Sequence, residues 1–364
     1  MFLDIKFNFF ELICLAFVSA FVISYLFIPT IVRMSKFKKL FDHIDERKIH
    51  TNAVPRLGGI AVFAGFFISS MLFVSFQFIN DLNAFLVGTI ILLFIGVKDD
   101  ILIISPITKL IGQFIAASIA VIFSKTLISN FYGFFNIFQI NYFFAVIITI
   151  FFYVFIINAF NFIDGIDGLA ASLGIIASFS IGIWFCLSGF YYMAIISAAF
   201  IAALLAFLRF NIFSLKNKVF LGDTGSMLIG FTVAFLSIKF LNLNLFLVKD
   251  AHFFILPAPA LVFAVMVMPI FDLVRIVIVR VVRNKKPYAP DNFHLHHIFY
   301  KLGLTHIQIT IIYSTYSILF IILSYFLSKC FSIRRLLLIE IIITLFVSFI
   351  PEYIYFLKSR KKMN

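Results

Sequence analysis

The chain has 364 residues, of which 63% are hydrophobic and only 12% charged, and its formal net charge is +13 at pH 7. A soluble globular protein averages about 25% charged and about 45–50% apolar residues, so this composition excludes a wholly water-soluble fold. The three cysteines, Cys14, Cys186 and Cys330, show neither metal-ligand nor disulfide spacing. No linker or low-complexity tract divides the sequence, which predicts a single membrane domain over residues 1–364.

Long apolar runs recur along the whole chain. A membrane-spanning helix needs about 20 mostly apolar residues. Candidate segments of roughly this kind lie at 12–32, 57–80, 82–97, 110–124, 142–158, 169–187, 190–208, 224–241, 253–274, 307–328 and 336–357. The charge-free stretch 169–208 is too long for one span, and Ser188-Gly189 is its expected break. The sequence therefore predicts an all-α, polytopic integral membrane protein with about 11 transmembrane helices.

Basic residues are distributed unequally between the two sets of connections. One set, with the C-terminal tail, holds 22 of the 29 Lys and Arg residues. Because Lys and Arg gather on the cytoplasmic side, we expect the N-terminus outside and the C-terminus in the cytoplasm. This bias explains the positive net charge without a nucleic-acid partner, and it suits anionic lipids and substrates.

Acidic residues cluster on the same side, at or just inside the ends of the predicted helices. They are Asp99, Asp100, Asp164, Asp167, Asp223 and Asp272. Carboxylates at membrane depth are costly and usually have a function. Their common location predicts one active-site cleft that faces the cytoplasm.

The sequence GVKDD ends the short segment 82–97, and Lys109 opens the next one. Two adjacent carboxylates such as Asp99 and Asp100 repel each other, so they usually share a cation or one of them takes up a proton. The alternative is a solvated helix end.

The sequence NAFNFIDGIDG follows segment 142–158. In a helix, Asn158, Asn161 and Asp164 share one face, and amide and carboxylate oxygens are the ligands that Mg²⁺ prefers. Gly165 and Gly168 permit an irregular backbone, which at this depth is tolerated where it lines a cavity. The alternative is a set of polar contacts between helices.

Asp223 lies in FLGDTGS at the start of segment 224–241. The N–H groups of a helix start attract phosphate, and a carboxylate there can hold a metal ion that bridges phosphates. The alternative is a simple Asp N-cap.

Two basic loops add candidate ligands for anions. The loop NKKPYAPDNFHLHH contains His294, His296 and His297, which we interpret as donors to phosphate and sugar because no zinc signature accompanies them. The loop DERKIH contains Lys48 and leads to PRLGG, where Gly58-Gly59 would allow helices to approach closely. The alternative for both loops is a solvated cytoplasmic surface.

In their sequences and in their order along the chain, these five motifs resemble those of the polyprenyl-phosphate N-acetylhexosamine-1-phosphate transferase family. The likeness runs from about residue 42 to 308 and is greatest to the bacterial undecaprenyl-phosphate N-acetylglucosamine-1-phosphate transferases. It implies an enzyme of the bacterial inner (plasma) membrane that transfers a sugar-1-phosphate from a UDP-N-acetylhexosamine to undecaprenyl phosphate and releases UMP. Its product would start a lipid-linked polysaccharide such as lipopolysaccharide O-antigen or teichoic acid.

The resemblance also assigns roles to residues. Asn161 and Asp223 would hold Mg²⁺, with Mn²⁺ as an allowed substitute, while Asp99 would deprotonate or position the lipid phosphate with Asp100 beside it. The substrate-binding residues would be Lys48, Lys109, Asp164, Asp167, His294, His296 and His297. Direct attack and a phospho-enzyme mechanism both stay open, as does a homodimer.

Two other functions compete with this interpretation. The first is a phospho-N-acetylmuramoyl-pentapeptide transferase, a branch of the same family that typically carries three adjacent His residues, whereas this chain has Leu295 after His294. The second is a secondary transporter, which would place its acids near the bilayer midplane, often in two related halves. Here only Glu340 is a charge well inside a predicted span.

Overall fold

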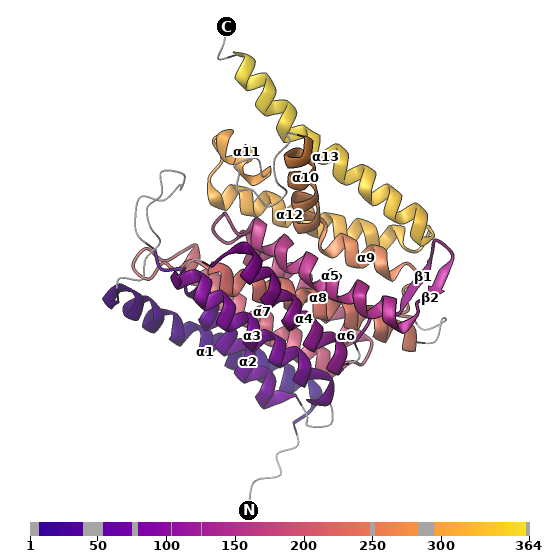
Figure 1. Cartoon of the computed structure of the whole chain (residues 1–364), viewed down its shortest axis with the longest axis horizontal. Coiled ribbons are helices and arrows are strands. Elements are labelled where there is room, and N and C mark those ends of the chain that lie inside the picture. The colour runs from indigo at the N-terminus through magenta and orange to yellow at the C-terminus, as the bar shows by residue number, and fades with distance from the viewer. Residues whose placement is uncertain are drawn as a thin grey trace, which may run out of the picture.

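The computed structural model describes residues 7–38, 54–74, 79–102, 104–124, 126–247, 252–282 and 295–361. Helices dominate these ranges, and a two-stranded hairpin interrupts them (Figure 1). In chain order the elements are α1 (Phe9–Phe37), α2 (Gly58–Phe73), α3 (Ile79–Leu102), α4 (Pro106–Ser124), β1 (Asn130–Phe134), β2 (Ile137–Gln139), α5 (Tyr142–Ile163), α6 (Leu169–Leu187), α7 (Tyr191–Asn211), α8 (Gly222–Phe246), α9 (Ala258–Val265), α10 (Val267–Val282), α11 (Leu295–Lys301), α12 (His306–Leu327) and α13 (Ile333–Lys361).

The predicted all-α membrane fold is confirmed, but the predicted count of eleven spans is not. In the described part of the chain, seven helices are long and apolar enough to cross a membrane, and they are α1, α4, α5, α6, α7, α8 and α12. The pair α9 and α10 bends by 74° and makes an eighth if it is counted as one span. Of the remaining predicted segments, α2 has only 16 residues, and α3 and α13 are not among the helices that qualify.

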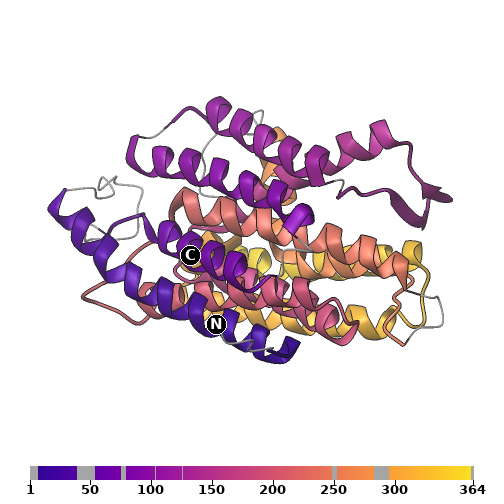
Figure 2. The same cartoon turned by 90° about the horizontal axis from the view of Figure 1, so that it is seen from below.

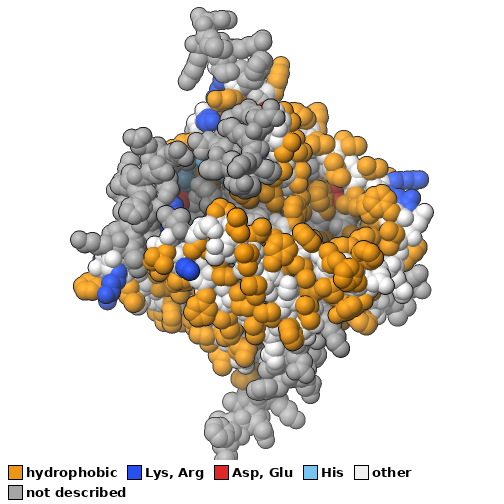
Figure 3. Space-filling model, in the orientation of Figure 1, with side chains coloured by type: hydrophobic (Ala, Val, Ile, Leu, Met, Phe, Trp, Pro, Cys, Tyr) orange, Lys and Arg blue, Asp and Glu red, His pale blue; other side chains and the backbone are white. Residues whose placement is uncertain are grey.

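The outer surface of the bundle is apolar. Large side chains such as Leu26, Phe123, Leu319 and Phe346 are 60–73% exposed. Figure 3 shows hydrophobic side chains over most of one face, with Lys and Arg toward its edges. Water would not tolerate so extensive an apolar surface on a monomer, whereas lipid does.

Helix α8 lies at the centre of the bundle. In its most apolar stretch 89% of the residues are buried, against 22% for α1. It packs against α2, α3, α5 and α6, and Figures 1 and 2 show these helices gathered around it. Small residues permit this closeness, because a Cβ atom on Gly59 would lie 2.2 Å from the backbone N of Gly225. The close approach predicted at Gly58-Gly59 is therefore confirmed.

Local signals in the sequence set several helix ends. A capping box between Thr305 and Gln308 starts α12, which satisfies backbone N–H groups that have no partner inside the helix. The predicted break at Ser188-Gly189 is confirmed, since α6 ends at Leu187 and Gly189 has φ +81°. Only glycine adopts that left-handed conformation without strain.

The hairpin of β1 and β2 was not predicted from the sequence. Its two strands follow α4 and precede α5 along the chain, and they pair with each other in antiparallel orientation. Tyr132 donates a hydrogen bond to the carbonyl of Leu241 near the end of α8 (2.5 Å). Figure 1 shows the hairpin at the opposite end of the bundle from α11. The strands are only five and three residues long, too short for a clear alternating pattern.

Candidate active site

The start of α8 is capped by a side chain from another helix. Leu221 precedes α8 and offers no side-chain cap. Instead Asp100, in the last turn of α3, accepts hydrogen bonds from the backbone N–H of Asp223 (2.7 Å) and from both the backbone N–H (3.1 Å) and the hydroxyl (2.6 Å) of Thr224. A negative charge is favourable at a helix N-terminus. This contact fixes Asp223 beside the acidic pair of α3.

Gly222 makes this cap sterically feasible. It has φ +74°, and a Cβ atom there would lie 2.0 Å from the carbonyl oxygen of Arg56 and 2.6 and 2.7 Å from the carboxylate oxygens of Asp100. The segment that contains Arg56 is held against the α8 entry by a backbone hydrogen bond from Phe220 N–H to the Pro55 carbonyl (2.8 Å). Any larger residue at position 222 would push Asp100 away.

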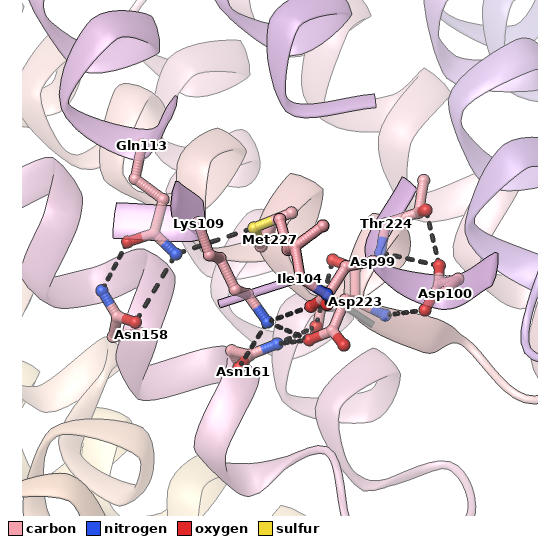
Figure 4. Close-up of polar contacts among 11 residues, drawn as sticks. Asp99, Asp100, Ile104, Lys109, Gln113, Asn158, Asn161, Asp223, Thr224 and Met227 are labelled. Atoms are coloured by element: carbon pink, nitrogen blue, oxygen red, sulfur yellow. Dashed lines mark hydrogen bonds and ion pairs between the residues drawn. The ribbon is translucent and has the colours of Figure 1, made fainter. Parts of the chain in front are cut away.

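The ammonium group of Lys109 lies where four helices meet (Figure 4). Its Nζ atom is 3.2 Å from Asp99 Oδ2 and 3.2 Å from Asn161 Oδ1, and it forms an ion pair with Asp223. These residues come from α4, α3, α5 and α8 in turn. The structure therefore brings together the four residues predicted to act on the phosphates and the metal ion.

Neighbouring contacts orient these side chains. Asp99 Oδ1 accepts the backbone N–H of Ile104 (2.8 Å), and the Asn161 amide donates to Asp223 and to the hydroxyl of Ser226 (2.8 Å). The side chain of Asp223 is 29% exposed, whereas those of Lys109 and Asp99 are 15% and 10% exposed. Asp223 is thus the acid of this cluster most open to a ligand.

Asn158 lies one turn deeper than Asn161 and has a different partner. Its amide donates to Gln113 Oε1 (2.7 Å) and to the Val154 carbonyl (2.7 Å). Gln113 is fully buried on α4, four residues after Lys109, so two polar pairs join α4 to α5. Gln113 was not singled out in the sequence, although a lone amide inside an apolar segment is itself a signal. The predicted common face of α5 holds for both Asn residues.

The DGIDG turn after α5 contains two acids in contrasting environments. Asp164 directly follows α5, and burial and then repulsion from Asp223, Asp100 and Asp167 raise its pKa well above its ordinary value. Burial also disfavours the charge of Asp167, but its contacts with His306 and Lys218 outweigh it and lower the pKa of Asp167.

Asp167 is bound on several sides. Lys218 Nζ lies 2.7 Å and His306 Nδ1 3.3 Å from its Oδ2 atom, and the Thr310 hydroxyl donates to its carbonyl (2.9 Å). Lys218 and His306 could not be predicted as partners of Asp167, because both lie far from it along the chain. These contacts tie the turn to α12 and to the loop before α8.

The histidine motif approaches the same turn. His296 and His297 lie on α11 with ring centroids 4.5 Å apart. A Cβ atom on Gly165 would lie 2.9 Å from His296 Nε2, so the imidazole contacts the DGIDG turn directly. The predicted residues Lys48 and His294 lie outside the described residues.

The oxygen atoms around Lys109 suit a hard cation. Asn161, Asp223 and Asp99 present amide and carboxylate oxygens to one positive centre, which is the donor set that Mg²⁺ takes. Within the described ranges, no group of three His, Cys, Asp or Glu side chains is arranged to hold a metal ion. Fewer protein ligands are enough for Mg²⁺, because it is usually bound by one or two carboxylates together with substrate phosphates.

Known proteins are similar to this chain in sequence. The profile of glycosyl transferase family 4 matches residues 82–241, which include Asp99, Lys109, Asn161 and Asp223. A decaprenyl-phosphate N-acetylglucosaminephosphotransferase of Mycobacterium tuberculosis (strain CDC 1551 / Oshkosh) is 33% identical over 288 residues, 73% of this chain and 70% of that protein.

Two further relatives cover more of the chain. A probable undecaprenyl-phosphate N-acetylglucosaminyl 1-phosphate transferase of Bacillus subtilis (strain 168) is 31% identical over 308 residues, 81% of each chain. An undecaprenyl-phosphate alpha-N-acetylglucosaminyl 1-phosphate transferase of Escherichia coli (strain K12) is 31% identical over 291 residues, 79% of this chain and 76% of that protein. With the membrane fold and the acid cluster, these similarities show that the chain is a multi-pass membrane phosphotransferase and belongs to the polyprenyl-phosphate N-acetylglucosamine-1-phosphate transferase family.

Proposed function

We propose that the enzyme transfers N-acetylglucosamine-1-phosphate, or the phosphate of a close N-acetylhexosamine epimer, from a UDP-sugar to undecaprenyl phosphate. UMP is released at the cytoplasmic face of the bacterial inner membrane. The observation that carries the proposal is the convergence of Lys109, Asp99, Asn161 and Asp223 from four helices. The Lys109 ammonium group can bind the phosphates of a diphosphate donor, and the oxygen atoms of the other three side chains can bind its metal ion.

Asn161 and Asp223 are the residues that would hold Mg²⁺, with Mn²⁺ as an allowed substitute. The bound ion would polarise the phosphoryl oxygens and neutralise charge on the departing UMP. Asn161 is preorganised for this task, because its amide N–H groups already donate to Asp223 and Ser226 and so turn its Oδ1 atom toward the cluster.

Lys109 and Asp99 would act on the two phosphate groups. Lys109 meets the diphosphate of the donor as a point charge. The second pKa of a phosphate monoester is about 6, so the lipid phosphate is mostly dianionic at neutral pH and needs positioning more than proton removal. Asp99 is suited to that positioning, because the Ile104 N–H holds one of its oxygens and Lys109 lies beside the other.

The histidine motif favours an amino-sugar donor. His296 and His297 lie side by side on α11 against the DGIDG turn, and Leu295 precedes them in place of a third adjacent His. We therefore favour UDP-N-acetylglucosamine over UDP-N-acetylmuramoyl-pentapeptide. A site that hydrogen-bonds the acetamido group would strongly reject UDP-glucose, because its own polar groups would lose their partners. The product would prime a cell-envelope polymer such as O-antigen or teichoic acid.

The test is transfer by the purified protein in detergent with undecaprenyl phosphate, Mg²⁺ and one donor at a time. UDP-N-acetylglucosamine, UDP-N-acetylgalactosamine, UDP-glucose and UDP-N-acetylmuramoyl-pentapeptide are compared by UMP release and by the mass of the lipid product. We expect turnover with an N-acetylhexosamine donor that stops when EDTA removes the metal. Preference for the pentapeptide donor, or UMP release without a lipid product, would contradict the proposal.

A further inference from the structure

Asp272 is a buried carboxylate with no role in the cluster around Lys109. It lies on α10, after the 74° bend that separates α10 from α9, and is 1% exposed. A buried carboxylate is costly, so its contacts need an explanation. Its Oδ1 atom accepts the backbone N–H of Leu295 (2.9 Å), which is the first residue of α11. One oxygen of Asp272 therefore fixes where the histidine helix begins.

The second oxygen of Asp272 faces an imidazole. Asp272 Oδ2 lies 3.9 Å from Nδ1 of His296, which is longer than a direct hydrogen bond but places the carboxylate at the edge of the ring. The side chain of His296 is also 1% exposed.

The other edge of the same ring meets the DGIDG turn. His296 Nε2 would lie 2.9 Å from a Cβ atom on Gly165, so the absence of a side chain at Gly165 is what admits the ring. Gly165 directly follows Asp164, which follows the proposed metal ligand Asn161 by three residues. The chain of contacts thus runs from Asp272 through His296 to the turn beside the active site.

A carboxylate behind an imidazole has a well-defined physical effect. It favours a proton on the facing nitrogen and holds the ring in one orientation, which leaves the far nitrogen directed at the DGIDG turn. Asp272 achieves this without approaching the reacting phosphates itself. Since its other oxygen anchors α11, the two contacts together set both the position and the orientation of the His296 ring.

We propose that Asp272 is a positioning residue that orients His296 over the DGIDG turn and thereby sets the affinity for the UDP-sugar donor and the discrimination among donors. This inference rests on the proposed function. It assigns Asp272 to the binding of the sugar and diphosphate and not to the binding of the lipid acceptor.

The test compares Asp272→Asn with wild-type protein. An Asn side chain keeps an oxygen that can accept the Leu295 N–H, so α11 stays anchored while the charge that faces His296 is lost. We expect kcat/KM for UDP-N-acetylglucosamine to fall about 10–100-fold, by analogy with the cost of losing a carboxylate that orients a metal-binding histidine. Most of the loss should appear in KM for the donor. KM for undecaprenyl phosphate should change less than about twofold, and the preference over UDP-glucose should shrink.

Two further variants separate positioning from folding. Glu352→Gln removes the ion pair between Glu352 on α13 and Arg275, one turn after Asp272 on α10, and should leave donor KM unchanged. In a His296→Ala background, Asp272→Asn should add less than about a twofold effect, because residues that act as a unit are not additive.

The outcomes are distinct. Any one of three results would overturn this inference and leave the proposed function standing. They are additive losses with His296→Ala, an equal rise in KM for both substrates, and an unchanged donor KM in a folded Asp272→Asn protein. Wild-type protein that is inactive with every N-acetylhexosamine donor would overturn the proposed function and this inference with it.

Discussion

Gly222 is a residue outside the acid cluster at which a single added methyl group should disturb the active site. Replacing it by Ala adds one methyl group to a residue with φ +74°. That methyl group would lie 2.0 Å from the Arg56 carbonyl oxygen and 2.6 and 2.7 Å from the two carboxylate oxygens of Asp100. Because the Arg56 contact is to backbone, the strain falls on both the segment before α2 and the cap of α8.

The structure gives the size of the disturbance. Ordinary van der Waals contact begins at 3.4 Å, so the Asp100 carboxylate must retreat by about 0.8 Å. It would then weaken the three hydrogen bonds that hold the start of α8, at 2.6 to 3.1 Å, and Asp223 would move with them. A misplacement of about 1 Å at a catalytic group can cost about 10²-fold in rate, which is the loss we expect in kcat/KM. The left-handed backbone of an Ala residue adds roughly 1–2 kcal/mol of destabilisation.

Gly189→Ala is the matched control. Gly189 also has a left-handed backbone, with φ +81°, but a Cβ atom there would meet no atom within 4 Å. Both variants should therefore lose a similar free energy of unfolding from backbone strain, and only Gly222→Ala should lose activity beyond that. The assay is UMP release per folded molecule, with the melting temperature of each variant measured by scanning fluorimetry in the same detergent.

Either of two results would refute the reasoning. If Gly222→Ala kept its activity within about twofold of wild type, Asp100 would not position Asp223 through the α8 cap. A comparable activity loss in Gly189→Ala would show that backbone strain alone, and not the displacement of Asp100, is responsible.

Four further predictions concern the acids and the topology. Asp99→Asn should lower kcat about 10²–10⁴-fold with nearly unchanged UDP-sugar affinity, and a loss of donor binding at intact turnover would move Asp99 to the donor site. Asn161→Ala and Asp223→Asn should each abolish transfer, because each removes a proposed Mg²⁺ ligand. If either variant kept near-full activity at limiting Mg²⁺, that residue would not be a metal ligand. Since burial and neighbouring acids raise the pKa of Asp164, the metal-free protein should lose stability as pH rises above the ordinary carboxyl pKa of about 4; Asp164→Asn should flatten that slope, and an unchanged slope would contradict the assignment. A cysteine at position 362 should be protected from an impermeant label in intact cells. Labelling from outside would show that the C-terminus faces out and that the predicted topology is wrong.

The sequence by itself determined the membrane fold and most of the candidate site. Apolar length and the near absence of charge require helices in lipid, because a buried backbone must satisfy its own hydrogen bonds. Charged and amide side chains at helix ends stand out against such a background, which is why Asp99, Lys109, Asn161 and Asp223 can all be predicted from the sequence. The number of spans was less certain, because short or charged helices such as α2 and α3 lie near the limit that composition can resolve.

The tertiary structure alone decided which partner each polar group takes. Asp100 and Thr224 are far apart in the sequence, yet the carboxylate of Asp100 caps α8 because Gly222 leaves room for it. Lys218 and His306 gave no local signal, and they became part of the site only when the fold brought them to Asp167. Sequence patterns record local periodicity and polarity, whereas these contacts depend on the relative placement of helices, which is set by packing across the whole bundle.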